Sequence, residues 1–126
     1  MSFGGYNQAF LDALPVGVYG CLAPDGQILF ANRRATELWG RQPVFGEDYY
    51  CASVRLYLPD GSWLPHAECP MAIAVREGRG CKNRIVTMER PDGSRVRVVI
   101  HVEPFRDESS GRVVGAVNVF HETPDQ

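Results

Sequence analysis

The side chains in this sequence that are suited to metal binding or nucleophilic chemistry are four cysteines and three histidines. Cys21, Cys51, Cys69 and Cys81 are widely spaced, and no two of them form a C-x-x-C pair. Zinc ribbons and fingers use closely paired cysteines, so the spacing argues against such a site. The N-terminal residues also lack the pattern of a secretory leader, and we therefore expect reduced thiols in a cytoplasmic protein.

His66 is the histidine with the most chemical interest, because it stands three residues before Cys69 and near a predicted helix start. At the mouth of a pocket it would be a candidate haem or metal ligand. One histidine and one cysteine do not complete a metal site, so we favour a turn residue with local hydrogen bonds. His101 and His121 are expected at the surface or in an interface.

The motifs of common enzyme classes are missing from the sequence. It contains no G-x-x-x-x-G-K-[ST], no G-x-G-x-x-G and no G-x-S-x-G segment. Asp25, Asp60 and Asp92 each stand in a Pro-Asp-Gly turn, where a local capping role explains the carboxylate. We therefore predict a non-catalytic domain with no metal site.

Asn118 is a polar residue within an otherwise apolar segment near the C-terminus. A buried amide without partners costs about 1–3 kcal/mol, so its side chain must find hydrogen bonds. It would bond either to neighbouring backbone or water, or to a ligand in a cavity, and the sequence favours neither. Together with Trp39, Met71 and Phe120 it forms our predicted cofactor or ligand pocket.

The composition limits which elements position these residues. The chain has 126 residues, 44% hydrophobic and 22% charged, with a net charge of −2, which fits one soluble domain. We expect no nucleic-acid partner, since no positive field would attract one, and no membrane span, since no apolar run is long enough. Thirteen glycines and nine prolines exclude a bundle of long helices.

The patterning predicts short helices and antiparallel strands. Helices are expected at 7–14, 33–39 and 71–77, where Asn32 and Pro70 mark the start of the second and third. Strands are expected at 16–22, 27–31, 84–90, 95–103 and 112–120, of which 95–103 alternates most clearly. Pro104 is expected to end that strand. A further hairpin around Asp60 is treated as an excursion from the sheet, and residues 41–53 show no clear period.

The order of these elements and three groups of motifs resemble the PAS domain family. The first is LDALPVGVYGCLAPDGQILFANRRATELWG (11–40), in which Asn32, Ala35 and Gly40 match a family signature. The second is YLPDGSWLPHAECPMAIAVREGR (57–79), which is similar to PAS domains of bacterial sensor histidine kinases. The third is RPDGSRVRVVIHVEPFRDESSGRVVGAVNVFHET (90–123), although Glu122-Thr123 replaces the family's closing D-I-T triad.

The resemblance implies an α+β PAS fold: a five-stranded antiparallel sheet with short helices packed on one face. A single PAS domain would span residues 1–126, with an N-terminal helix or cap at 1–15, the core at 16–121 and a polar tail at 122–126. It also implies a role in signal transduction. The domain would bind a small ligand or a protein partner and signal to an output module, such as the histidine kinase of a two-component system.

The identity of a bound cofactor stays unknown at this stage. The flavin-photosensing subclass uses a reactive cysteine in an N-C-R-F-L-Q-like segment, which this sequence lacks, so flavin is not expected. Haem would depend on His66 alone and has no further support.

The partners implied are an output domain or kinase and a second copy of the chain. Tyr6, Phe10 and Leu14 recur at four-residue spacing and are the candidate dimer contacts of the N-terminal helix. The same stripe would equally well pack on its own sheet. The alternative function is a ligand-free PAS module for protein interaction or dimerisation.

Overall fold

The computed structural model describes residues 4–124, with side chains from Gln8 onward. The elements, in chain order, are α1 (Gly4–Asp12), β1 (Gly17–Leu22), β2 (Ile28–Ala31), α2 (Arg33–Trp39), β3 (Arg55–Tyr57), β4 (Trp63–Leu64), a 3₁₀ turn η1 (His66–Glu68), α3 (Pro70–Glu77), β5 (Cys81–Glu89), β6 (Arg95–Arg106) and β7 (Val113–Glu122). This order confirms the predicted α+β PAS fold. No helix within residues 4–124 is long and apolar enough to cross a membrane.

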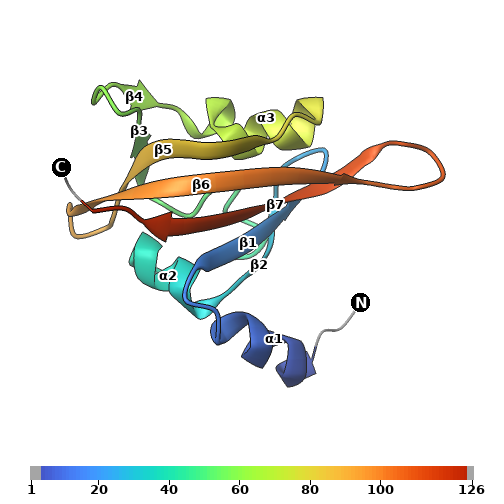
Figure 1. The fold of residues 1–126 in the computed structure, drawn as a ribbon, viewed down its shortest axis with the longest axis horizontal. Coiled ribbons are helices and arrows are strands. Elements are labelled where there is room, and N and C mark those ends of the chain that lie inside the picture. The colour runs from blue at the N-terminus through green and yellow to red at the C-terminus, as the bar shows by residue number, and fades with distance from the viewer. Residues whose placement is uncertain (1–3, 125–126) are drawn as a thin grey trace.

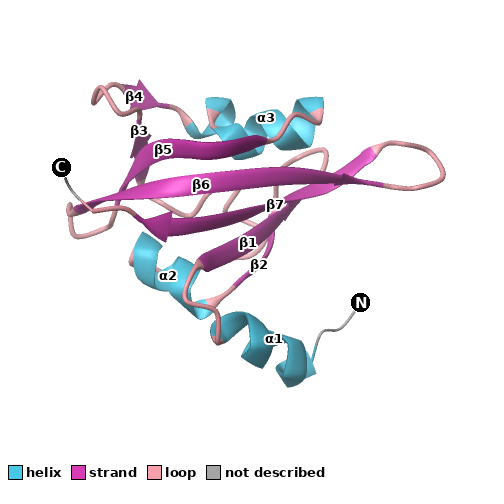
Figure 2. Cartoon of the chain, viewed as in Figure 1, coloured by secondary structure: helices cyan, strands magenta, loops and turns pink. Residues whose placement is uncertain are grey.

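The strands form one antiparallel sheet in the order β2-β1-β7-β6-β5-β3-β4. β7 lies between β1 and β6 and is central, as its apolar sequence suggests (Figure 1). In the view of Figure 2, α3 lies above β5 and β6, whereas α1 and α2 lie below β7. Helices α2 and α3 contact the sheet through β1, β6 and β7 and cover the buried face.

The sheet has seven strands, so the predicted number of five is wrong. The hairpin around Asp60 belongs to the sheet, because β3 pairs with β5 and carries β4 at the edge. Leu56 and Leu64 face each other across this hairpin and are both buried. Burial of these two leucines explains why the hairpin extends the sheet instead of projecting from it.

Strand β6 also continues past Pro104, where we expected it to end. Its neighbour β5 begins at Cys81, opposite Val102, so β6 has only β7 as a partner beyond that point. A proline without an N–H is tolerated at such an open edge. The strand therefore runs on to Arg106, and the β6–β7 connection projects from the body of the domain (Figure 1).

The remaining boundaries differ from the predictions by a few residues. Helix α1 spans Gly4–Asp12 instead of 7–14, and the Asp12 carboxylate accepts a hydrogen bond from Arg33 N–H (2.6 Å). β5 begins three residues earlier than expected, at Cys81, and β7 extends to Glu122. Glu122 therefore belongs to the last strand and not to a polar tail.

Asn32 connects the first helix, the first strand and the second helix. Its Oδ1 accepts from Val18 N–H (2.8 Å) and Ala35 N–H (3.0 Å), while its Nδ2 donates to the carbonyls of Leu11 (2.8 Å) and Val16 (2.9 Å). Asn32 is fully buried. The predicted N-cap thus has a second role, because one side chain joins three elements of the fold.

Candidate functional site

The interior between the sheet and the helices is almost completely filled. The cavity that remains there has a volume of about 10 Å³, and Tyr19, Cys51, Cys69, Met71, Met88 and Asn118 contribute to its lining. A space of this size holds about one water molecule. Larger hollows are open to solvent, such as a groove of about 280 Å³ between α3 and β5 that includes Ile73 and Arg84.

Three aromatic rings fill the part of the core beside this cavity. The Tyr19 ring lies 4.8 Å from that of Trp39 and 5.8 Å from that of Phe120, measured between centroids. Trp39 and Phe120 are fully buried. Of the four predicted pocket residues, Met71 and Asn118 line the cavity, whereas Trp39 and Phe120 pack against Tyr19.

Asn118 faces the cavity from the inner side of β7, where it pairs with Tyr19 on β1 and Val102 on β6. Its side chain is only 3% exposed. Its Nδ2 end interacts with the Tyr19 hydroxyl, whereas no group in residues 4–124 donates a hydrogen bond to Oδ1. Asn118 Oδ1 is therefore a buried hydrogen-bond acceptor in the lining of the cavity, and it has no donor among the described residues.

Tyr19 connects the sheet to the segment that closes the cavity. Its hydroxyl donates to the Tyr50 carbonyl at 2.7 Å. Burial raises the pKa of Tyr19 well above its ordinary value, and the nearby thiols of Cys51, Cys21 and Cys69 raise it further. The phenol is therefore a neutral hydrogen-bond donor and not a base.

Cys51, Ser53 and His66 form a polar cluster at the edge of the cavity. The Cys51 thiol lies 3.1 Å from the Ser53 hydroxyl. His66 Nε2 donates to the Ser53 carbonyl at 3.0 Å and lies 3.5 Å from its hydroxyl. The turn η1 thus places the predicted haem or metal candidate in the same cluster as the Cys51 thiol, and its side-chain hydrogen bonds run to Ser53, 13 residues away, instead of to its own turn. No group of three or more metal-ligating side chains occurs within the described residues.

The cluster shifts the pKa values of both Cys51 and His66. Burial alone would raise the pKa of the Cys51 thiol, but the hydrogen bond and charge of His66, aided by Ser53, bring it below its ordinary value. The hydrogen bond with Cys51 raises the pKa of His66 despite partial burial. Burial raises the pKa of Cys69 to about 12, and it also raises the pKa values of Cys21 and Cys81. Cys51 is thus the cysteine with the greatest thiolate character.

The segment that carries Cys51 is the one without a readable sequence pattern. It folds back on the first hairpin, where Tyr49 bridges to Gln27 and Tyr50 N–H donates to the Gly26 carbonyl (2.8 Å). Gly26 has a positive φ of 84°, and a Cβ there would lie 2.1 Å from the Tyr50 ring. Glycine at this turn therefore permits the close approach that brings Cys51 to the cavity.

Arg41 and Asp48 hold the same segment in place. The two side chains form a bidentate ion pair at 2.8 and 3.2 Å, and Arg41 also donates to the Ala52 carbonyl at 2.8 Å. Partial burial would raise the pKa of Asp48, but hydrogen bonds from Arg41 and Val44 N–H lower it below its ordinary value.

Replacing Asp48 with asparagine is expected to lower the free energy of unfolding at neutral pH by about 1 kcal/mol. A depressed carboxylate pKa stabilises the fold above the unfolded-state value of 3.8, and this contribution is lost as the pH falls through the folded-state value. Denaturant melts between pH 7 and pH 2.5 should therefore show the difference between wild type and Asp48→Asn shrinking with acid. If the difference in the free energy of unfolding between wild type and Asp48→Asn stays constant with pH, the charge of the Asp48 carboxylate does not stabilise the fold.

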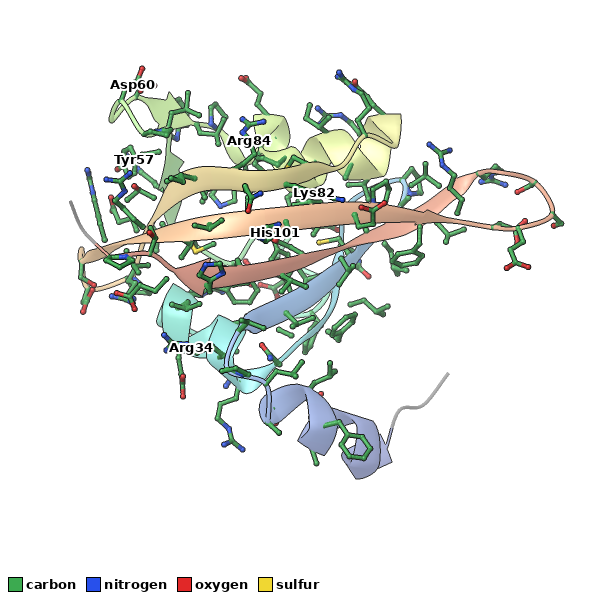
Figure 3. All side chains as sticks on the ribbon, in the orientation of Figure 1. Arg34, Tyr57, Asp60, Lys82, Arg84 and His101 are labelled. Atoms are coloured by element: carbon green, nitrogen blue, oxygen red, sulfur yellow. The ribbon has the colours of Figure 1, made fainter. Side chains whose placement is uncertain are left out.

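The other candidate residues lie outside this site. Phe10 and Leu14 of the proposed dimer stripe are 65% and 42% exposed, and the Tyr6 side chain lies outside the described residues. His101 alternates with inward-facing residues of β6 and lies on the opposite face of the sheet, where its ring stacks on His121 at 6.4 Å (Figure 3). Sequence reasoning did not connect Cys51 or Ser53 with His66, because nothing in their spacing to His66 indicates contact.

The comparison with family models and the comparison with solved structures both identify PAS domains as similar to this chain. Residues 15–123 match the family model described as PAS domain. No curated protein sequence matches the chain. Among solved structures, the PAS domain of an HTR-like protein from Haloarcula marismortui has 18% identity and a TM-score of 0.63, over 94% of this chain and 89% of that one.

Light-oxygen-voltage (LOV) domains are also similar in structure. The LOV domain of the blue-light photoreceptor Aureochrome1 has 22% identity and a TM-score of 0.64, over 98% of this chain and 91% of that one. A Rhodobacter sphaeroides LOV protein has 14% identity and a TM-score of 0.67, over 95% of this chain but 66% of that one. At these identities the neighbours show a shared fold.

Proposed function

The chain belongs to the PAS domain family, and on this premise we propose that it is a signal-input module with its receptive site at the Asn118 cavity. PAS domains are generally non-catalytic sensors. In the proposed role, a small molecule with a hydrogen-bond donor enters the core, and the resulting shift of the sheet is passed to an output module such as a histidine kinase.

The observation that supports this proposal is the unpaired Oδ1 of Asn118. An acceptor that is 3% exposed and without a donor raises the free energy of the folded state by about 1–3 kcal/mol. A ligand that donates to it would recover this free energy. Binding would then select the conformation in which the cavity is open enough to accept the donor.

The position of Asn118 also suggests how the signal leaves the core. It lies in the central strand β7, between Val117 and Val119, whose side chains point to the opposite face of the sheet. A displacement of β7 at Asn118 would therefore alter the outer face, where we propose that the output module or a second copy docks.

A ligand-free interaction module is the second candidate, and the small cavity favours it. Ligand sites usually measure about 300–1,000 Å³, far more than the roughly 10 Å³ found here. The three-ring system of a flavin does not fit this space, so we propose no flavin-dependent step. In this second role the exposed Phe10 and Leu14 of α1 would contribute to a homodimer.

Native mass spectrometry and an absorption spectrum of the purified protein separate the two candidates. An added small-molecule mass, lost on denaturation, would support the sensory proposal. An unliganded dimer with a featureless visible spectrum would support the interaction module. A Soret band would instead identify a haem and would make His66 the first residue to test as its ligand.

Replacing Asn118 with leucine is expected to change the free energy of unfolding by less than about 1 kcal/mol, because removal of an unpaired acceptor offsets the lost contact with Tyr19. Thermal melts will measure this, with Val119→Leu as the control that places the same side chain on the outer face of β7. The leucine variant should also lose any ligand found by native mass spectrometry. A loss of stability above about 2 kcal/mol would show that the amide is already fully paired.

A further inference from the structure

Cys51 and Cys69 are both buried and both line the core cavity, but only Cys51 belongs to a polar cluster with a histidine. Its thiol lies 3.1 Å from the Ser53 hydroxyl, which in turn lies 3.5 Å from His66 Nε2. Cys21 and Cys69 have no histidine among the groups that shift their pKa values, and Cys81 lies on β5, only half-buried. An adjacent imidazolium favours the thiolate, which is the nucleophilic form of cysteine.

We propose that Cys51 is a redox-modification site, at which hydrogen peroxide oxidises the thiolate to a sulfenic acid. The thiolate sulfur attacks one peroxide oxygen, so that the S–O bond forms as the O–O bond breaks. The departing hydroxide takes the proton of the His66 imidazolium and leaves as water. Cysteine is thereby oxidised, peroxide is reduced, and His66 becomes neutral.

The size of the cavity selects the oxidant. A space of about 10 Å³ holds about one water molecule, so hydrogen peroxide needs only a slight opening of the cavity, whereas a bulky alkylating agent or a glutathione disulfide needs a large one. Because Cys51 is buried, a large reagent in the solvent also cannot reach its sulfur atom directly. Exposed thiols react with large and small reagents alike, so a strong preference for peroxide is specific to this environment.

Asn118 provides independent support, because its Oδ1 is an unpaired acceptor in the same cavity. A thiolate has no hydrogen to donate, whereas a sulfenic acid carries an O–H. The oxidised product would therefore satisfy an acceptor that the reduced protein leaves without a donor. The added oxygen also overfills a packed core next to β7, which gives the modification a route to the outer face of the sheet.

The experiment treats the reduced, folded chain with hydrogen peroxide, removes the peroxide, and then unfolds the chain in the presence of dimedone, so that access to the buried sulfur no longer limits trapping. The adducts are mapped by peptide mass spectrometry. Loss of the reduced Cys51 peptide is followed in parallel. We expect Cys51 to react at least tenfold faster than Cys21, Cys69 or Cys81. His66→Gln should slow the reaction at Cys51 by a factor of about ten or more, since it removes the charge that favours thiolate.

Two controls separate this site from general thiol reactivity. Cys81→Ser removes the most exposed thiol and should leave the rate at Cys51 unchanged, while a bulky maleimide should label Cys81 before Cys51. The order in which the cysteines of the wild-type chain are oxidised tests the proposal first, because this measurement does not require a variant to fold. Oxidation of Cys81 ahead of Cys51, or an unchanged rate in folded His66→Gln, would overturn the proposal. The result does not depend on whether a ligand binds at Asn118.

Discussion

Replacing Asn32 with alanine is expected to lower the free energy of unfolding by about 3–4 kcal/mol and the melting temperature by about 10 °C or more. The side chain makes four hydrogen bonds of 2.8–3.0 Å to backbone groups of Val18, Ala35, Leu11 and Val16. Alanine leaves the buried N–H groups of Val18 and Ala35 without the side-chain acceptor and removes the donor to the half-buried carbonyls of Leu11 and Val16, of which Leu11 still accepts from Leu14 N–H. It also removes the N-cap of α2, which by itself is worth about 1 kcal/mol.

Asn118→Ala is the matched control for this experiment, because it removes the same side chain from an equally buried site. Asn118 has an unpaired Oδ1, so its loss should cost far less than the loss of Asn32. Asn32→Asp extends the comparison, since it keeps the acceptors but turns a negative oxygen toward the carbonyls of Leu11 and Val16. We expect it to be at least as destabilising as alanine. Equal effects of Asn32→Ala and Asn118→Ala in chemical denaturation would contradict this account.

Asn32 also illustrates what could be predicted from the sequence. Its N-cap role follows from a local pattern, an asparagine before a short amphipathic run that ends at Gly40. The Pro-Asp-Gly turns are local in the same way. Asp60 and Asp92 accept hydrogen bonds from the serine two residues later, and Gly61 and Gly93 have the expected positive φ. Such features depend on neighbours in the chain, which the sequence displays directly.

The features that the predictions missed depend on contacts between distant segments. Pro104 was expected to end its strand because the sequence does not show that β5 begins opposite Val102. The proximity of Cys51 to His66 was missed because His66 lies on a separate turn and residues 41–53, which carry Cys51, show no helical or strand period. The Arg41–Asp48 ion pair and the contact of Tyr50 with Gly26 hold the segment that carries Cys51 in place, and neither of them has a sequence signature.

Phe120 was predicted as a pocket residue, and its substitution tests whether the core is packed or receptive. The ring is fully buried, lies 5.8 Å from that of Tyr19 and 5.9 Å from that of Trp39, and covers Gly17, where a Cβ would come within 2.7 Å of it. Phe120→Ala is therefore expected to lower the free energy of unfolding by about 3–5 kcal/mol. Val119→Ala, next to it on the half-buried outer face, should cost about 1 kcal/mol or less.

The space that the phenyl ring leaves behind provides a second measurement. It would be lined mainly by Tyr19, Trp39 and the backbone at Gly17, and an apolar cavity of this kind takes up benzene. Benzene should therefore raise the melting temperature of Phe120→Ala but not that of wild type, whose cavity of about 10 Å³ is too small for it. If Phe120→Ala costs less than about 1 kcal/mol, or if benzene stabilises wild type equally, the core already opens in solution. Phe120 would then line a ligand pocket, and the sensory role would take precedence over the ligand-free one.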